Sequence, residues 1–206
     1  GGDNHLRSEF MAQLRKLADE YEAMLIYDEI QTGVGLTGKF WCHEHFGPDA
    51  LPDMLVFGKK MQVCGILVSN RIDEVEQKVF KVSSRINSTW GGNLVDMVRA
   101  TKIMEIIAED NLCANAARMG AYLQQQLQKL AEKYEVISNV RGKGLLTAFD
   151  FPDTETRDMF IKKGLDNQIM FLGGSSKTIR FRPALIMEQE HIDEGLQAME
   201  KIKSVI

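Results

Sequence analysis

Hydrophobic and polar positions alternate in blocks along the first part of the chain. Apolar residues recur at helical spacing from Leu6 to Tyr21, which predicts an amphipathic helix. The apolar run Ala23–Tyr27 ends at Asp28, and its length and neighbours are typical of a strand buried on both faces of a parallel sheet. Met54–Phe57 and Gly65–Ser69 predict two further strands. Helix, strand and loop in this order indicate an α/β domain.

The second half of the chain has a different texture. After a loop at 83–92, the pattern predicts helices at 93–109, 112–134, 154–165 and 190–204, and strands at 136–140, 145–149, 169–172 and 178–181. These short strands and helices form a small α+β unit. We therefore place a domain boundary near residue 95, between an α/β part at 1–94 and an α+β part at 95–206.

Composition narrows the class of protein. The chain has 206 residues, 44% of them hydrophobic and 26% charged, which is ordinary for a globular protein. A net charge of −4 without blocks of like charge argues against nucleic acid or a membrane surface as the main partner. Cys42, Cys64 and Cys113 form no CxxC pair, and their odd number predicts the reducing cytoplasm. The opening Gly1-Gly2 is neither a starting methionine nor a signal peptide, so we expect a fragment of a longer chain.

Two polar residues follow buried strands. Asp28 ends the first predicted strand, and Lys59 comes shortly after the second. Ligands of open α/β sheets bind beyond the carboxyl ends of strands, so these side chains are expected to meet in a partly dry pocket. A desolvated lysine becomes a nucleophile that can form an imine, and a buried carboxylate needs a cationic partner such as a protonated pyridine nitrogen. Alternatively, Asp28 is a turn or capping residue and Lys59-Lys60 a surface pair.

Further candidates lie in loops and on a late strand. Ser88 and Thr89 precede a predicted helix and could hold a phosphate, or simply cap that helix. Arg180 and Arg182 alternate on one strand and could bind a carboxylate, although a solvated strand face is an equal alternative. The run His43-Glu44-His45 lacks the spacing of a zinc-binding helix, so no metal is expected.

The order of these residues resembles a known family. Leu25-Ile-Tyr-Asp-Glu-Ile-Gln-Thr-Gly33, then Thr37-Gly38, then Asp53-Met-Leu-Val-Phe-Gly-Lys59 resembles the signature of the class III, omega-type aminotransferases, which use pyridoxal 5'-phosphate (PLP). Within that class, Phe57–Gly65, Arg85–Asn93 and Ile179–Pro183 are most similar to the L-lysine 6-aminotransferases (lysine ε-aminotransferases). Gly38-Lys-Phe-Trp41 and His43-Glu-His45 are shared with the 4-aminobutyrate aminotransferases.

The resemblance implies a fold and a set of roles. It implies the PLP-dependent transferase fold type I, with part of the large PLP-binding α/β domain at 1–94 and a linking helix plus small α+β domain at 95–206. The implied activity is transfer of the terminal amino group of L-lysine to 2-oxoglutarate by a homodimer. The implied residues are Lys59 for the Schiff base and proton transfer, Asp28 at the pyridine nitrogen, Gln31 at the phenolic oxygen, Ser88 and Thr89 at the partner subunit's phosphate group, Asn87 near the substrate and Arg180 at its carboxylate.

The resemblance also implies parts that this chain does not carry. These are a glutamate directly before Gly1 that gates the use of two substrates, a glycine-rich phosphate loop and an aromatic residue stacked on the cofactor ring. Three alternatives therefore stay open at this point. One is an aminotransferase for 4-aminobutyrate or another omega-amino acid, another is an inactive truncated chain that only associates with a partner subunit, and the last is a PLP racemase or decarboxylase.

Overall fold

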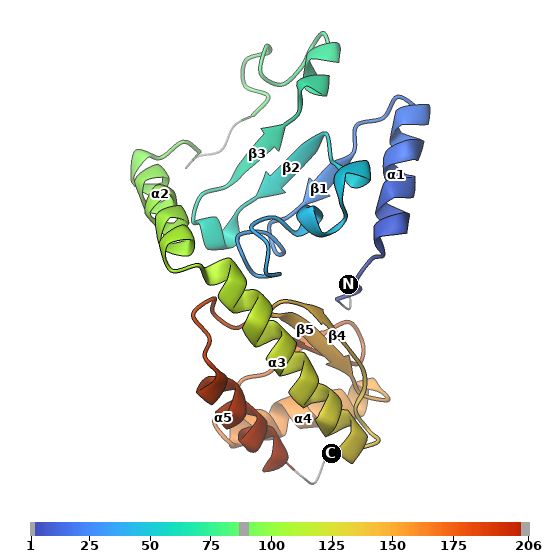
Figure 1. Cartoon of the computed structure of the whole chain (residues 1–206), viewed down its shortest axis with the longest axis vertical. Coiled ribbons are helices and arrows are strands. Elements are labelled where there is room, and N and C mark those ends of the chain that lie inside the picture. Colours follow the sequence, from blue (N-terminus) through green and yellow to red (C-terminus); the bar gives the residue numbers. More distant parts are fainter. Residues whose placement is uncertain (1–2, 87–90, 203–206) are drawn as a thin grey trace. The chain divides into compact units, whose positions relative to one another are not determined.

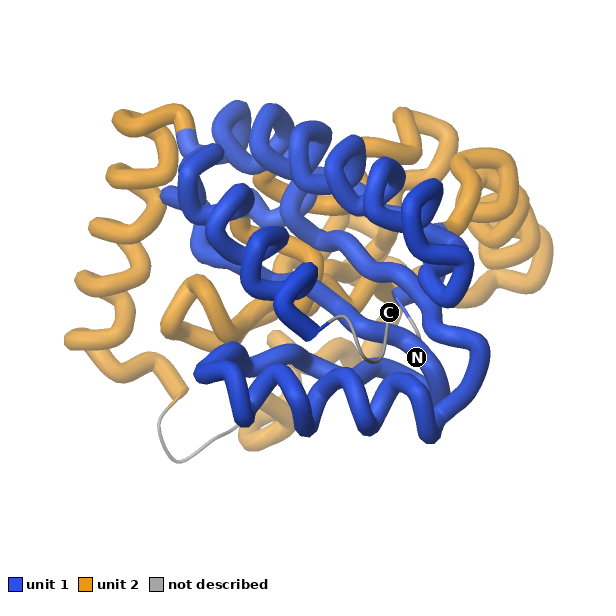
Figure 2. The backbone as a smooth tube through the Cα atoms, turned by 90° about the horizontal axis from the view of Figure 1, so that it is seen from below, with its two compact units in different colours: residues 1–5, 35–38, 112–206 blue, residues 6–34, 39–111 orange. Residues whose placement is uncertain are grey.

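A computed structural model of the chain describes residues 3–86 and 91–202, which form two compact units (Figures 1 and 2). Among these residues, unit 1 comprises 3–5, 35–38 and 112–202, and unit 2 comprises 6–34, 39–86 and 91–111. The units divide at 111/112, where the backbone of Asn111 is left-handed (φ 50°). The helix at 94–109 thus belongs to unit 2, whereas the sequence pattern placed the division near residue 95. The assignment of 1–94 and 95–206 to two family domains stays a prediction.

Unit 2 is built on a three-stranded sheet in the order β1-β2-β3 (Figure 1). β1 (Ile26–Asp28) is parallel to β2 (Met54–Phe57), and β3 (Gly65–Val68) is antiparallel to β2. The helices are α1 (Ser8–Glu20) and α2 (Leu94–Glu109), and the 3-10 turns are η1 (Cys42–His45), η2 (Pro48–Ala50), η3 (Lys59–Met61) and η4 (Asn70–Glu74). A small core of Met11, Tyr27 and Ala50 fixes α1 and η2 against β1.

The predicted burial of the first strand on both faces is wrong. Tyr27 is buried and its hydroxyl donates to the Ala50 carbonyl oxygen at 2.8 Å, but Ile26 is 54% exposed and Asp28 is also exposed. β1 is an edge strand whose Tyr27 face packs on the core, and successive side chains of a strand point to opposite faces. The face that carries Ile26 and Asp28 is left uncovered in this chain.

Asp53 joins three elements of unit 2. Its carboxylate is buried and accepts from the Leu25 N–H at 2.7 Å, from Arg15 Nη1 at 2.8 Å and from Arg71 Nη1 at 3.2 Å. Burial alone would raise the pKa of Asp53, but the Leu25 N–H and the two guanidinium groups outweigh it and lower the pKa. The ionised form of Asp53 is therefore favoured by folding and holds α1, β1 and η4 together.

We expect Asp53→Asn to destabilise the protein by about 2–3 kcal/mol at pH 7, because it leaves two guanidinium groups without their shared carboxylate. A folded-state pKa below the unfolded value gives stability that is present above about pH 3.9 and is lost as the pH falls through the folded pKa. Urea unfolding should therefore show a wild-type advantage at pH 7 that shrinks below pH 3.9. The exposed Asp49→Asn is the control, and an equal loss in both variants would contradict the role of Asp53.

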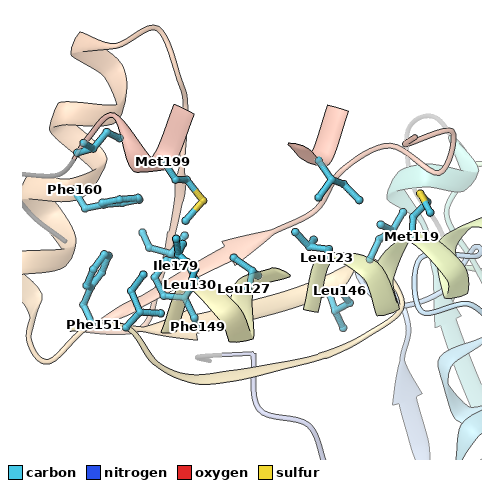
Figure 3. Close-up of a cluster of buried hydrophobic side chains, with 14 of the residues drawn as sticks. Met119, Leu123, Leu127, Leu130, Leu146, Phe149, Phe151, Phe160, Ile179 and Met199 are labelled. Carbon is cyan, nitrogen blue, oxygen red and sulfur yellow. The ribbon is translucent and has the colours of Figure 1, made fainter. Parts of the chain in front are cut away.

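Unit 1 is an α+β unit on a four-stranded antiparallel sheet in the order β4-β5-β7-β6 (Figure 1). Its strands are β4 (Ser138–Lys143), β5 (Leu146–Asp150), β6 (Leu172–Gly174) and β7 (Thr178–Phe181), and its helices are α3 (Leu112–Lys133), α4 (Thr154–Asp166) and α5 (Gln189–Glu200). β5 is buried along its whole length. The sheet and helices share a core that includes Leu127, Phe149, Phe160 and Ile179, all with an exposed fraction of 0% (Figure 3).

One close backbone contact joins α3 to the turn between β4 and β5. A Cβ atom at Gly120 of α3 would lie 2.0 Å from the carbonyl carbon of Gly144, and Gly144 itself has a φ of +53°. Both positions therefore require glycine, the first for space and the second for its left-handed backbone. In the described part of the chain, no helix is long and apolar enough to cross a membrane, and no group of three or more His, Cys, Asp or Glu residues could hold a metal ion.

Candidate active site

The carboxyl ends of two neighbouring parallel strands lie side by side in unit 2. Asp28, the last residue of β1, is paired with Val56 of β2, and the Glu29 N–H donates to the Val56 carbonyl oxygen at 2.8 Å. Lys59 begins the turn η3 directly after β2 and Gly58. Asp28 and Lys59 therefore leave the sheet at the same edge, where α/β proteins bind their ligands.

Gln31 connects the two strand ends. Lys59 Nζ donates to Gln31 Oε1 at 2.7 Å, and Lys60 Nζ donates to the Gln31 carbonyl oxygen at 2.7 Å. The backbone of Lys59 is left-handed (φ 47°), a conformation that costs energy for a residue with a Cβ atom. The structure thus brings Gln31, Lys59 and Lys60 together through hydrogen bonds between segments far apart in the sequence.

The expectation of a dry pocket is wrong for this chain. Asp28 is exposed because the face of β1 that carries it is uncovered, and Lys59, which begins η3, is exposed as well. Asp28 Oδ1 accepts from the Ile30 N–H at 3.0 Å, and no other partner of this carboxylate lies within the described residues. Asp28 therefore keeps one carboxylate oxygen available to a bound group, while the exposed Lys59 amine is hydrogen-bonded to Gln31.

An aromatic cluster supports both strand ends. Trp41 packs against Phe57 of β2, with ring centroids 5.9 Å apart, and against Gly33, where an added Cβ atom would lie 2.8 Å from Trp41 Cε3. Gly33 lies at the end of the turn that contains Gln31, and Phe57 precedes Gly58 and Lys59 in the chain. Glycine spacing alone does not indicate that one of these glycines makes room for the indole ring of Trp41.

The run His43-Glu44-His45 has a structural task in the chain. Glu44 Oε1 accepts from the Trp41 N–H at 2.6 Å and so caps η1, whereas His43 Nδ1 lies 2.9 Å from Glu29 Oε1. Sequence reasoning missed Glu29, which is only 3% exposed. The alternation of strand residues was the available signal, since Asp28 and Glu29 point to opposite faces.

The two arginines of the predicted carboxylate site differ in their partners. Arg180, on β7 of unit 1, has no hydrogen bond or ion pair with any described residue, and its Nε is buried without a partner. Arg182, just beyond β7, forms an ion pair with Asp3. Burial lowers the pKa of Arg182, an effect that the Asp3 carboxylate opposes. The structure therefore leaves Arg180 as the guanidinium free to bind a ligand carboxylate, and Asp3 is a further residue that sequence reasoning missed.

Three predicted site residues fall outside the described part of the chain. Asn87, Ser88 and Thr89 lie in the gap at 87–90, so their roles stay predictions. Beyond this gap, the side chain of Asn93 accepts from the Val95 N–H at 2.9 Å and caps the N-terminus of α2.

The residues present fit a PLP site in their chemistry. Lys59 offers an amine, Asp28 a carboxylate and Gln31 an amide, all at one sheet edge. The family model for class III aminotransferases matches residues 1–203. The chain belongs to the class III aminotransferases. Its fold is accordingly that of the PLP-dependent transferases of fold type I, as the resemblance to this family implied.

Several relatives of this aminotransferase chain are known. It is 44% identical over 207 residues to the L-lysine-epsilon aminotransferase of Mycobacterium tuberculosis, an alignment that covers 100% of this chain and 46% of that protein. It is 37% identical over 204 residues to the 4-aminobutyrate aminotransferase of Kluyveromyces lactis, covering 98% of this chain and 42% of the relative. The chain spans about half the length of the curated relatives it matches.

Solved structures agree with these relatives. The lysine aminotransferase of M. tuberculosis in its internal aldimine form superposes with a TM-score of 0.93 at 43% identity, over 100% of this chain and 47% of that one. The ornithine aminotransferase of Plasmodium yoelii has a TM-score of 0.84 over 97% of this chain and 53% of that one. At 24% identity the latter likeness concerns the fold alone.

Proposed function

We propose that the full-length protein is a PLP-dependent aminotransferase that moves the terminal amino group of L-lysine to 2-oxoglutarate. The observation that supports the proposal is the placement of Lys59, Gln31 and Asp28 at the carboxyl ends of two parallel strands, with Lys59 hydrogen-bonded to Gln31. The identity of 44% to lysine ε-aminotransferases along the whole chain supports lysine as the donor.

Lys59, Asp28 and Gln31 of unit 2 would each bind a different part of the cofactor. PLP, when bound, supplies an aldehyde that accepts an amine and a pyridinium ring that draws electrons from the substrate carbon. Lys59 Nζ would hold the aldehyde and later carry the proton between carbon atoms. The Asp28 carboxylate would keep the ring nitrogen protonated, and Gln31 would bind the phenolic oxygen with its amide. The hydrogen bond from Lys59 to Gln31 supports this assignment, because it places the amine beside the amide.

Arg180 would bind the carboxylate of the substrates. A guanidinium group binds a carboxylate through two parallel hydrogen bonds, and this arginine has no competing partner among the described residues. The Arg180 stem packs beside β6, where an added Cβ atom at Gly174 would lie 3.4 Å from Arg180 Cδ. Asn87 would lie near the substrate, and Ser88 and Thr89 would reach the phosphate of the partner subunit's cofactor.

We further propose a homodimer that works in the cytoplasm. The support for a dimer is α2, where Leu94 is 81% exposed and Val98 71% exposed, an apolar surface of the kind that subunits bury. The support for a reducing compartment is that Cys42, Cys64 and Cys113 form no disulfide bond within the described residues.

An alternative donor is 4-aminobutyrate or another omega-amino acid, which the 37% identity to a 4-aminobutyrate aminotransferase favours. An alternative for the 206-residue chain alone is an inactive partner-binding fragment, which the exposure of both Asp28 and Lys59 favours. The first alternative concerns which amine the full-length protein uses, and the second concerns whether the 206-residue chain alone turns over any amine.

Amino transfer by the full-length protein tests the proposal. With 2-oxoglutarate as acceptor, we expect kcat/KM for L-lysine to exceed that for L-ornithine by at least about tenfold, since ornithine is one methylene shorter and a pocket discriminates one methylene by this order. We expect at least the same preference over 4-aminobutyrate, which is shorter still and lacks the α-amino group. Replacing Arg180 with alanine should raise KM for 2-oxoglutarate about 100-fold, because charge-assisted hydrogen bonds to the carboxylate are lost.

Arg157→Ala is the matched control, since this guanidinium of α4 bonds the Ser175 carbonyl oxygen and Asp158 instead. A preference for 4-aminobutyrate would replace lysine as the proposed donor. An unchanged KM in Arg180→Ala would remove this arginine from the site.

A further inference from the structure

Glu29 carries a buried carboxylate directly beside the residues of the candidate site. It is 3% exposed and accepts from the Cys42 N–H at 2.5 Å, from the His43 N–H at 2.8 Å and from His43 Nδ1 at 2.9 Å. Burying a charge is costly unless it is paired and hydrogen-bonded, and here all three donors belong to the single turn η1. The carboxylate therefore fastens η1 to the carboxyl end of β1.

The backbone of Glu29 is bound on both sides as well. Its N–H donates to the Val56 carbonyl oxygen at 2.8 Å, and its carbonyl oxygen accepts from the Gly33 N–H at 2.9 Å. The first bond extends the pairing of β1 with β2, and the second closes the turn that contains Gln31. Glu29 is thus the junction between β1, the Gln31 turn and η1.

The turn η1 in turn contacts both segments that supply the candidate site. Trp41, which precedes η1, lies against Gly33 after the Gln31 turn and against Phe57 before Lys59. Asp28 precedes Glu29 and points to the opposite face of the strand. A shift of η1 away from β1 would consequently move Asp28 and Gln31 relative to Lys59.

His43 contributes the side-chain half of this contact. An ionised carboxylate only accepts hydrogen bonds, so the His43 ring faces Glu29 with the proton on Nδ1. The Glu29 carboxylate therefore requires a hydrogen-bond donor at the position of His43 Nδ1. An asparagine at 43 can place an amide N–H near it, whereas an alanine cannot.

We propose that Glu29 is a positioning residue, with His43 as its partner, that acts on the cofactor through Asp28 and Gln31. The inference rests on the proposed function and assigns a role to His43 that neither a metal site nor a solvated turn explains. Glu29 touches no reacting atom. Its carboxylate sets where the two cofactor-facing side chains of its own segment lie.

The test uses the pH dependence of the visible absorption band of the full-length protein with PLP. Glu29→Gln replaces one acceptor oxygen with an NH2 group that faces backbone N–H donors, so the contact with η1 is broken. A displaced Asp28 carboxylate would stabilise the protonated ring nitrogen less well. The ring would then be richer in electrons, and the pH midpoint of the absorption band would rise. We expect a rise of about one pH unit and a PLP dissociation constant about tenfold higher.

Glu44→Gln is the matched control, because Glu44 caps the same turn but, among the described residues, binds the Trp41 N–H alone. It should leave both the midpoint and the dissociation constant unchanged even where it lowers the urea midpoint. The pair His43→Ala and His43→Asn repeats the test with Glu29 intact. The first should shift the midpoint upward and the second should restore it.

The outcomes separate this inference from the proposed function. An upward shift in Glu29→Gln and His43→Ala, with none in Glu44→Gln and His43→Asn, supports positioning by Glu29. Equal shifts in Glu29→Gln and Glu44→Gln, or no shift in either Glu29→Gln or His43→Ala, overturn it while the aminotransferase proposal stands. A wild-type protein that gains no visible band with PLP overturns the proposed function and the positioning role together.

Discussion

Replacing Lys59 with alanine in the full-length protein is expected to lower kcat for lysine and 2-oxoglutarate by about 10⁴-fold or more. The substitution removes both the amine that holds the cofactor and the group that moves the proton, and proton transfer by a placed side chain alone contributes up to about 10⁴-fold. Borohydride reduction followed by mass spectrometry of peptides should fix the cofactor on Lys59 in the wild type. The same treatment of Lys59→Ala should leave no cofactor bound to the protein.

Lys60→Ala is the control that the chain itself offers. Lys60 lies next to Lys59 and also bonds Gln31, but through the carbonyl oxygen of that residue. We expect Lys60→Ala to keep cofactor on Lys59 after reduction, with turnover reduced only modestly because the Gln31 turn loses one contact. Cofactor found on residue 60 of the wild type would contradict the assignment of Lys59.

The part of the fold that the sequence predicted well depends on local pattern. Met54–Phe57 was predicted to the residue, because an apolar run is bounded there by Asp53 and Gly58. The predicted bounds of β1 were too early in the chain, because the apolar run covers 23–27 whereas the observed strand is Ile26–Asp28. The pairing with β2 decides where the strand lies. Burial of β1 on both faces could not be inferred from the run alone, because it depends on which elements cover the sheet.

In the candidate site too, some features follow from local sequence pattern and others depend on the tertiary fold. The placement of Asp28 and Lys59 at one sheet edge follows from two parallel strands that end there, which a sequence pattern can indicate. The difference between Arg180 and Arg182 does not, because the ion pair that occupies Arg182 comes from Asp3, 179 positions away. Glu29 was missed for a similar reason, since its donors lie 13 and 14 positions further along. Contacts of this kind are set by the tertiary fold.

The second large effect is expected at Asp28, where asparagine should lower kcat/KM by about 10²–10³-fold, as is usual when one charged group that stabilises a transition state is lost. Asparagine has nearly the same shape as aspartate, and its amide oxygen can still accept from the Ile30 N–H. The backbone at the end of β1 should therefore hold, and the urea midpoint should remain near that of the wild type. What disappears is the negative charge that would keep the pyridine nitrogen protonated.

The measurement for Asp28→Asn combines steady-state kinetics with the pH titration of the visible band, whose midpoint should rise because the ring withdraws fewer electrons. Asp49→Asn, exposed in the same unit, removes one carboxylate without touching the sheet edge and should change neither quantity. Full turnover and an unmoved midpoint in Asp28→Asn would mean that this carboxylate does not face the ring. Because the Lys59–Gln31 contact does not involve Asp28, cofactor could still be fixed on Lys59 in that case. The two substitutions thus test the amine and the carboxylate of the site independently.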